Sequence, residues 1–494
     1  MIHFISSMLR RFFPENRDLH AVHKAAARGN AEAQFMLGEM YRLGVGVPQN
    51  GQEAMAWLHK AAERGHPRAQ VNLGELCSVG TDAPDHAAAA RWFRKAAERG
   101  DARGQMLLGV LYEAGKGVPQ DAATAASWYR RAAEQGDAAS QVCLGELMEK
   151  GHGVAQDFQG ALHWYRQAAA QGDARGQANL GMMYEFGKGV PQDLPEAVAW
   201  YRKAAEQGNS MGQVLLGVMY ERGKGVAKDF AKAVHWYRTA ADRGDAIAQI
   251  TLGVMYEFGR GVPQDDAEAV RWYRQSAEQG HANGQFKLGS MYMRGRGAPL
   301  ELAEAGLWYH RAAVQGHAKA QSNLGVMYHF GKGVAQDDDA AARWFRQAAE
   351  QGNAEGQVLL GDLYESGEAL PVDHGEAVNW YRKAAEQGHS KGQTRLGMMY
   401  KSGKGVAQDD DAAAHWFRQA AEQGYGEGQA QLGAMYVRGR GVARDELQGY
   451  MWLHRAALQG DEKSIQACAV LAERLSPEQV AQAQERARAV SPPA

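Results

Sequence analysis

A Leu-Gly pair returns at a nearly constant interval along the chain. Twelve such pairs form a periodic series in 494 residues, with a spacing of 36 residues in every interval except one of 35. A glutamine stands three residues before each leucine, and each copy contains one of the 12 tryptophans. The leucines are Leu37, Leu73, Leu108, Leu144, Leu180, Leu216, Leu252, Leu288, Leu324, Leu360, Leu396 and Leu432. A fixed period of this length is typical of a protein built by repeating one supersecondary unit.

Each copy contains two stretches with helical spacing of apolar and small residues. In the first copy, Gln34, Leu37 and Tyr41 share one helical face, and Ala54, Trp57 and Ala61 share another. A glycine follows each stretch in all twelve copies, seven residues after the leucine or eight after the tryptophan. Glycine tolerates the left-handed backbone that ends a helix, and the Asn or Asp that often follows the second glycine is a good N-cap. We therefore predict one helix-turn-helix unit per copy.

The predicted helices are too short to bury their apolar faces alone. A helix of about 13 residues is only about 20 Å long, and the glycine after each leucine leaves a hollow for an aromatic ring of a neighbouring helix. Stacking of copies solves this problem, so the predicted fold is all-α: an α/α superhelical solenoid of about twelve 36-residue repeats with capping helices at both ends. The predicted organisation is a flexible segment at 1–16, a capping half-repeat at 17–30, twelve repeats at 31–461 and capping helices at 462–491.

The repeat pattern resembles a known family. Gln-x-x-Leu-Gly-x-x-Tyr, then Gly-x-Gly-Val, then Ala-x-x-Trp-Tyr/Phe-Arg-x-Ala-Ala-Glu-Gln-Gly is similar to the SLR (Sel1-like repeat) family, a relative of the tetratricopeptide repeat. The resemblance covers residues 20–475. It implies a tetratricopeptide-like helical solenoid that acts as a scaffold and gathers partner proteins in signalling, envelope or quality-control assemblies. Some bacterial members of the family contact host proteins. The resemblance implies no reaction.

Charge and motif content argue against most other classes of protein. Lys and Arg number 55 against 57 Asp and Glu, which gives a net charge of −2 and no overall attraction for nucleic acid. The Gly-Lys-Gly turns lack the spacing of a phosphate-binding loop, and no His-Glu-x-x-His occurs. Three cysteines cannot form a disulfide framework. We expect no catalytic residue, no cofactor and no metal.

The chain carries only weak targeting signals. Its first residues contain a short apolar stretch followed by Arg10 and Arg11, the reverse of the order in a secretory signal. No apolar run approaches the length of a membrane helix. We expect a cytoplasmic protein without membrane insertion. Export to the periplasm or outside the cell is the alternative, because members of the similar family are often exported. The sequence leaves the oligomeric state open.

The best candidate for a binding site is the concave face, which first helices line in tetratricopeptide-like stacks. By analogy, the exposed positions lie five and two residues before each leucine, and two, five and six residues after it. In the fourth to ninth copies these positions hold carboxylates, phenylalanines, arginines and aliphatic side chains, an apolar band flanked by charge. The candidate partner-binding residues are Glu149, Met182, Glu185, Phe186, Val218, Glu221, Arg222, Val254, Glu257, Phe258, Arg294, Val326 and Phe330.

The sequence therefore predicts a non-catalytic scaffold that binds other proteins along its concave face. The fifth to ninth copies are expected to bind an extended or helical partner segment with basic and apolar residues, which the glutamates would steer and the phenylalanines would hold. In the opposing interpretation the phenylalanines pack into the core between repeats and the glutamates are merely solvated. A hydrolase of the β-lactamase type is the alternative in the enzyme class. The cysteine pair per repeat that marks such relatives is missing here.

Overall fold

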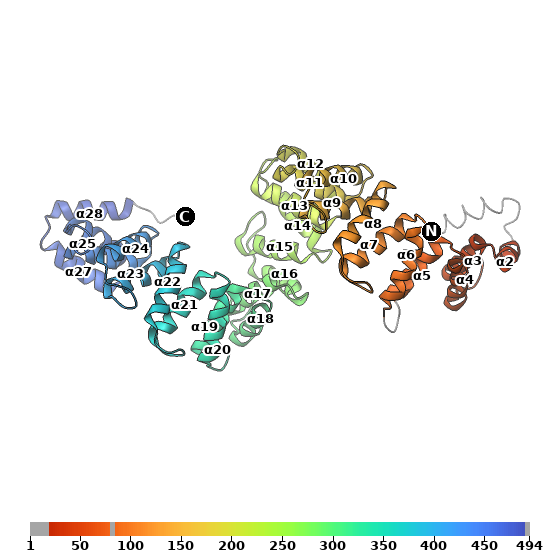
Figure 1. Cartoon of the computed structure of the whole chain (residues 1–494). Coiled ribbons are helices and arrows are strands. Elements are labelled where there is room, and N and C mark those ends of the chain that lie inside the picture. Colours follow the sequence, from red (N-terminus) through yellow and green to blue (C-terminus); the bar gives the residue numbers. More distant parts are fainter. Residues whose placement is uncertain (1–18, 80–83, 490–494) are drawn as a thin grey trace. The chain divides into compact units, whose positions relative to one another are not determined.

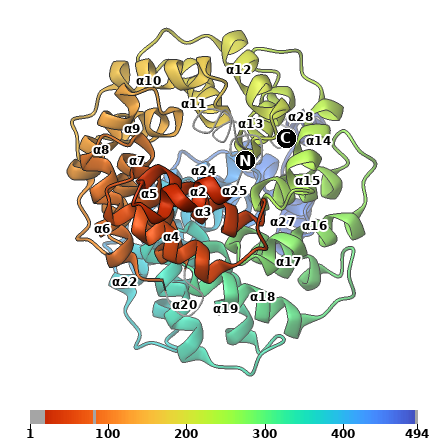
Figure 2. The ribbon, with the colours of Figure 1, turned by 90° about the vertical axis from the view of Figure 1, so that its right-hand side faces the viewer.

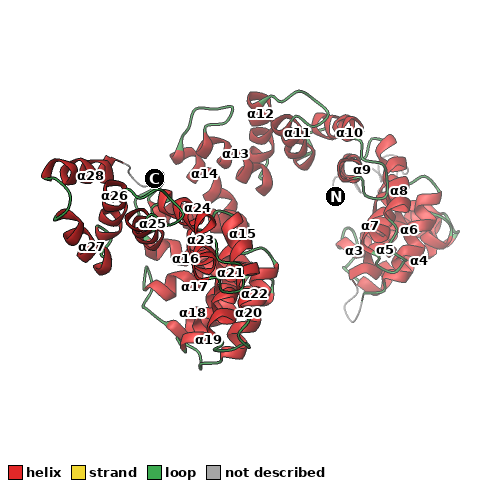
Figure 3. Ribbon diagram, turned by 60° about the vertical axis from the view of Figure 1, so that its left-hand side comes forward, coloured by secondary structure: helices red, strands yellow, loops and turns green. Residues whose placement is uncertain are grey.

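The computed structural model describes residues 19–79 and 84–489, and all 27 regular elements in these ranges are helices joined by turns and loops (Figure 3). The all-α fold and the helix-turn-helix repeat are thereby confirmed. The predicted flexible segment 1–16 lies outside the described residues. The chain divides into two compact units, Met1–Arg243 and Gly244–Ala494.

The first unit begins with the short helix α2 (Leu19–Ala27), which packs on the first repeat (Figure 1). Six hairpins follow. Their first helices are α3 (Ala31–Leu43), α5 (Pro67–Val79), α7 (Ala102–Ala114), α9 (Ala138–Lys150), α11 (Ala174–Phe186) and α13 (Ser210–Arg222). Their second helices are α4 (Gly51–Glu63), α6 (His86–Glu98), α8 (Ala122–Glu134), α10 (Phe158–Ala170), α12 (Leu194–Glu206) and α14 (Phe230–Ala241).

The second unit contains six further hairpins and two helices that close its C-terminal end. The first helices are α15 (Ala246–Phe258), α17 (Ala282–Arg294), α19 (Ala318–Phe330), α21 (Ala354–Ser366), α23 (Ser390–Ser402) and α25 (Gly426–Arg438). The second helices are α16 (Asp266–Glu278), α18 (Leu302–Val314), α20 (Asp338–Glu350), α22 (His374–Glu386), α24 (Asp410–Glu422) and α26 (Glu446–Ala457). The closing helices α27 (Glu462–Ala472) and α28 (Pro477–Ala489) both pack on α26.

The predicted helix ends are confirmed. At the start of α11 the carboxylate of Asp173 accepts a hydrogen bond of 2.7 Å from the backbone N–H of Gly176, and Asn209 caps α13 in the same way. At the end of α11, Gly187 has a φ of 66°, and its N–H donates to the carbonyl of Met183. A side chain would be strained in this left-handed conformation, which explains the glycine at this position.

The core of each hairpin lies between the glycine after the leucine and the residue after the tryptophan. A Cβ added to Gly181 would come within 2.6 Å of the ring of Tyr201, so the glycine leaves the space that the ring fills. Tyr201 is fully buried, whereas its neighbour Trp200 is half-buried. The predicted hollow is confirmed, but its occupant is the residue after the tryptophan. Trp272 and Trp308 alone among the 12 tryptophans are buried.

Hydrogen bonds link neighbouring repeats at fixed positions. In most repeats the buried glutamine three residues before the leucine donates its amide N–H to a carbonyl at the end of the preceding helix, as Gln213 does to Ala205 at 3.1 Å. The arginine two residues after the tryptophan donates to the tyrosine hydroxyl of the next repeat, as Arg202 does to Tyr220. The recurring glutamine thus satisfies carbonyls that the end of a helix leaves without an intrahelical partner.

First helices form the inner side of each stack. Within each unit, first helices of neighbouring repeats contact one another, as α9 does α11 and α19 does α21, whereas neighbouring second helices of the repeats make few contacts. In the first unit, α7, α9 and α11 lie on the inner side of the curve, and α8, α10 and α12 lie on the outer side (Figure 2). Positions on the first helices therefore decide what the inner face presents.

Candidate functional site

The predicted glutamates form hydrogen bonds with buried tyrosines. Tyr201 follows the tryptophan of its repeat and donates its hydroxyl to Glu185 at 2.8 Å. Burial, and then the hydrogen bond to this carboxylate, raise the pKa of Tyr201 far above its usual range. The same bond joins Tyr129 to Glu113, Tyr165 to Glu149, Tyr237 to Glu221, Tyr273 to Glu257 and Tyr381 to Glu365.

The identity of the residue after the tryptophan matches the presence of the glutamate throughout the chain. The six copies that carry a glutamate five residues after the leucine all have tyrosine after the tryptophan. The five copies with phenylalanine or leucine there carry other residues at the glutamate position: Arg42, Ser78, His329, Lys401 and Val437. In the remaining copy the hydroxyl of Tyr309 donates instead to Ser290. The glutamate is therefore a structural partner of the tyrosine.

Cations of the next repeat contact the other side of these carboxylates. Lys188 donates to Glu149 at 2.8 Å, and Lys224 lies 3.7 Å from Glu185. In the second unit, the guanidinium of Arg296 is 3.9 Å from Glu257. Each cation stands eight residues after the leucine of its own repeat, in the Gly-x-Gly turn. Much of the negative charge in the glutamate row is thus neutralised within the protein.

The prediction that the glutamate position is exposed is wrong for two of the candidates. Glu185 and Glu257 have exposed fractions of 7% and 5%, and Glu149 and Glu221 are half-buried. The position two residues before the leucine was also expected to be exposed, but Ala178 and most of its equivalents are buried between repeats. The buried tyrosine hydroxyl needs an acceptor, and this need draws the carboxylate inward. A basic partner would find little free negative charge here.

The predicted phenylalanines are the accessible apolar part of the candidate surface. Phe186, Phe258 and Phe330 have exposed fractions of 59%, 54% and 60%, so they do not pack into the core between repeats. Each is the last residue of a first helix. The cation two residues later lies over the ring: Lys188 at 5.9 Å, Arg260 at 5.5 Å and Lys332 at 5.4 Å from the ring centroids. These distances are within the range of cation–π attraction.

The remaining candidates differ in accessibility. Arg222 and Arg294 are exposed and are also the last residues of first helices, α13 and α17. The aliphatic candidates one turn earlier are half-buried: Met182, Val218, Val254 and Val326. The ends of the first helices therefore present alternating phenylalanine and arginine above a partly covered aliphatic row, within each unit.

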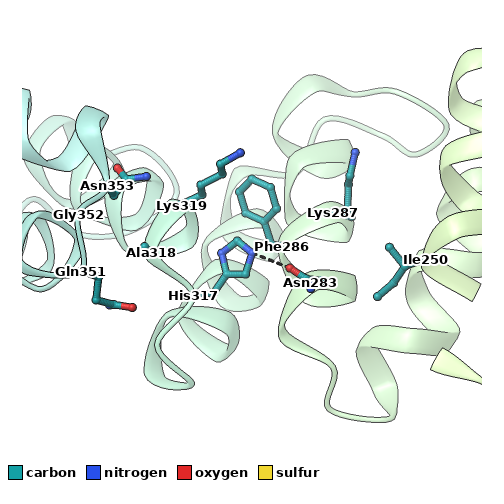
Figure 4. A pocket seen from close by; sticks show the side chains of 10 residues that line it. All are labelled: Ile250, Asn283, Phe286, Lys287, His317, Ala318, Lys319, Gln351, Gly352 and Asn353. Atoms are coloured by element: carbon teal, nitrogen blue, oxygen red, sulfur yellow. Dashed lines mark hydrogen bonds between the residues drawn. The ribbon is translucent and has the colours of Figure 1, made fainter. Parts of the chain in front are cut away.

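A cavity of about 560 Å³ lies where α17, α19 and the start of α21 meet (Figure 4). His317 stacks on Phe286, with ring centroids 4.6 Å apart. The Nδ1 atom of His317 accepts from the N–H of Ala320 at 3.1 Å, so its Nε2 donates to Asn283 at 3.0 Å. Burial, and then the charge of Lys319, lower the pKa of His317. This histidine serves as a helix cap, and no predicted candidate lines the cavity.

A second cavity of about 670 Å³ brings Val326 and Phe330 together with side chains of α21 and α23. Asp362 lies in its wall and receives Lys391 at 3.0 Å and Arg395 at 3.2 Å. Lys391 and Arg395 were not among the predicted candidates. Lys391 holds the position five residues before its leucine, which was expected to be exposed, and Arg395 holds the position directly before the leucine, which was not considered. A third cavity, also of about 670 Å³, lies on α3, α5 and the start of α7 and contains none of the candidates.

Two kinds of feature are absent from the part of the chain that the structure describes. In residues 19–79 and 84–489, no three His, Cys, Asp or Glu side chains come together in a way that could hold a metal ion. None of the helices in these ranges is both long enough and apolar enough to span a bilayer. In each unit, the ends of first helices carry exposed phenylalanine and arginine side chains, residue types that are common in protein interfaces.

Comparison with known proteins agrees with the repeat reading. The family model described as "Sel1 repeat" matches twelve consecutive segments: 31–66, 67–101, 102–137, 138–173, 174–209, 210–245, 246–281, 282–317, 318–353, 354–389, 390–425 and 426–461. A search of curated proteins gave no match.

Solved structures give two informative matches. One is the crystal structure of c5321, a protective antigen present in uropathogenic Escherichia coli strains that displays an SLR fold. Its sequence is 38% identical to this one, the alignment covers 88% of this chain and 94% of c5321, and the TM-score is 0.65. A Sel1 repeat protein from Oxalobacter formigenes is 33% identical over 70% of this chain and 89% of its own, with a TM-score of 0.42.

Proposed function

Since the chain belongs to the Sel1 repeat family, whose helical stacks are typical of protein–protein interaction scaffolds, we propose that it is a non-catalytic scaffold that binds a partner polypeptide along the inner face of its first helices. The observation that supports this most is the exposure of Phe186, Phe258 and Phe330 at equivalent positions. Large apolar side chains that alternate with arginines at the ends of successive first helices are unusual for a surface that contacts only water.

The phenylalanines account for affinity in this proposal. Aromatic residues and arginine dominate the binding energy of most protein interfaces. Each ring lies beneath a cation of its own turn, so a partner side chain can pack on an aromatic face whose orientation is already restricted. The half-buried aliphatic residues one turn earlier, such as Val326, extend the apolar area without becoming a second exposed patch.

The test is a selection of peptides from a random library on the immobilised full chain, followed by measurement of their dissociation constants. The variant replaces Phe186, Phe258 and Phe330 with alanine. We expect the selected peptides to bind it at least about 30-fold more weakly, which corresponds to a loss of about 2 kcal/mol for a central anchor. Helical content measured by circular dichroism should not change, because these rings are exposed.

A matched control replaces three other exposed aliphatic residues of the second unit that do not lie on first helices: Leu300, Val314 and Leu458, with exposed fractions of 62%, 61% and 61%. This control should bind the selected peptides as the wild type does. Equal weakening of peptide binding in both variants would mean that the assay detects nonspecific hydrophobic binding. Unchanged binding in the phenylalanine variant would place the site on another face and refute the proposal.

A further inference from the structure

At one junction, between the eleventh and twelfth repeats, the positions of the glutamate and the turn cation both hold cations. In the fourth and fifth repeats, and again in the seventh, a carboxylate five residues after the leucine meets a cation 39 residues later in the next repeat, as Glu149 meets Lys188. At the same spacing, the eleventh and twelfth repeats place Lys401 and Arg440. Two cations therefore occupy positions that elsewhere hold an ion pair.

The surroundings of Lys401 show that the charge is not compensated in another way. Burial, and then the positive charges of Arg438 and Arg440, lower the pKa of Lys401, while Asp410 acts in the opposite direction. The ammonium group donates to the neutral amide oxygen of Gln431 at 2.8 Å. Phe417 stands where other repeats have the tyrosine, so no hydroxyl reaches this position. Three cations thus face one carboxylate.

That carboxylate is already engaged. Asp410 Oδ2 lies 3.3 Å from the Nε atom of Arg440. Arg438 is exposed at the end of α25 and has no ion-pair partner among the described residues. Half of the Arg440 side chain is also exposed. The helices α23 and α25, which carry Lys401 and Arg438, pack against each other in the blue part of the chain (Figure 1).

We propose that Lys401, Arg438 and Arg440 form a binding site for the carboxylates of a short acidic segment of a partner protein. This proposal rests on the scaffold function proposed above and specifies the charge of the partner. It reverses the sign expected from the glutamate row, because those glutamates are engaged by tyrosines and cations. Here Arg438 and Arg440 are exposed, Lys401 is half-buried, and Asp410 is the carboxylate that pairs with Arg440. Guanidinium groups bind carboxylates by paired hydrogen bonds, which favours the two exposed arginines as direct ligands.

Acidic side chains elsewhere in the second unit disfavour a long polyanion as the ligand. Glu368 and Glu365 of the tenth repeat lie in the wall of the cavity that also contains Phe330, and Glu427 is at the start of α25. A long polyanion such as nucleic acid would meet these acidic side chains on leaving the site.

The decisive variant replaces Lys401 with glutamate and Phe417 with tyrosine. It installs the tyrosine–glutamate pair of six other repeats and places a carboxylate at the usual spacing from Arg440, so the change should not lower the thermal midpoint. The control is Lys463→Glu, which makes the same change in net charge at an exposed residue of α27. Both variants are made in the full chain.

The experiment selects peptides from one random library on the wild type and on the two variants. We expect the peptides selected on the wild type and on the Lys463 control to be enriched in clustered Asp and Glu, and those selected on the double variant to lack this enrichment. The acidic peptides should bind the double variant at least about tenfold more weakly. Binding to the wild type should weaken as NaCl rises from about 50 to about 300 mM.

Each result is informative. Equal acidic content on the wild type and the double variant refutes the acidic site, while the phenylalanine variant still tests the scaffold separately. If neither the double variant nor the phenylalanine variant binds its selected peptides more weakly than the wild type does, both proposals are refuted. Tighter binding of a single-stranded DNA oligonucleotide than of any acidic peptide, lost in the double variant, would overturn the choice of a protein partner.

Discussion

Removal of one buried hydroxyl tests the role assigned to the glutamate row. In Tyr201→Phe the ring that fills the hollow at Gly181 stays, and only the donor to Glu185 is lost. Glu185 then remains buried at 7% exposure, with Lys224 at 3.7 Å as the ion-pair partner shown by the structure. A hydrogen bond to a charged group contributes about 1.5–3 kcal/mol, and loss of the donor leaves a desolvated carboxylate.

We therefore expect a local loss of about 2 kcal/mol in the fifth repeat. Twelve similar repeats need not unfold in one step, so a single unfolding midpoint is a poor measure of this loss. Hydrogen exchange measured by mass spectrometry reads the repeats separately. Amides of α11 and α12 should exchange about 30-fold faster, since each 1.36 kcal/mol is a factor of ten. Amides of distant repeats should not change.

The double variant Tyr201→Phe/Glu185→Ser supplies the control. It copies the second repeat, where Phe93 accompanies Ser78, and no buried carboxylate remains without its donor. We expect the double variant to exchange more slowly than Tyr201→Phe alone, which is the signature of coupling between the two side chains. Faster exchange in the double variant, or an unchanged rate in the single one, would show that the glutamate does not depend on the tyrosine.

Two further predictions concern pH. Burial raises the pKa of Tyr201 above its unfolded value near 10, so the stability that depends on this group is complete below about pH 10 and decreases as the pH rises. Between about pH 10 and 11, Tyr201→Phe should therefore lose about 1 kcal/mol less of its free energy of unfolding in urea than the wild type loses, and equal losses would contradict the assignment. Burial lowers the pKa of His317 below its unfolded value near 6.5, so protonation of the unfolded chain destabilises the fold as the pH decreases from about 7.5 to about 5.5. In His317→Asn the asparagine can cap the helix as Asn353 does in the next repeat. The thermal midpoint of this variant should therefore decrease less over this pH range than that of the wild type.

The sequence predicted the repeat and its helix ends because both depend on local rules. The glycine at Gly187 and the cap at Asp173 are properties of a few consecutive residues, and the structure has them as expected. The hollow at Gly181 was also predicted, because a glycine on the packed face of a helix leaves space that an aromatic ring of the neighbouring helix can fill. These features need no knowledge of how one repeat lies on the next.

The candidate site was harder to predict because exposure depends on contacts between helices. Glu185 looks like a surface residue until Tyr201, 16 residues away, is known to point at it. A comparison among the copies of this chain contains the signal, because glutamate occurs only where tyrosine follows the tryptophan. The cavity at Phe330 requires the rotation between successive repeats, which the pattern within one repeat does not encode.

The ion pairs between a glutamate and a turn cation 39 residues later imply that whole repeats can be removed while the pairing is kept. In the pairs that the structure shows, a carboxylate contacts a cation in the turn of the next repeat. Removal of a whole copy would therefore place a new cation at the same distance along the chain wherever the following turn carries one. Excision of residues 174–209 would bring Lys224 to Glu149. Excision of 390–425 would set Glu365 at the pairing distance from Arg440, and the one junction with like charges would disappear without a single point mutation.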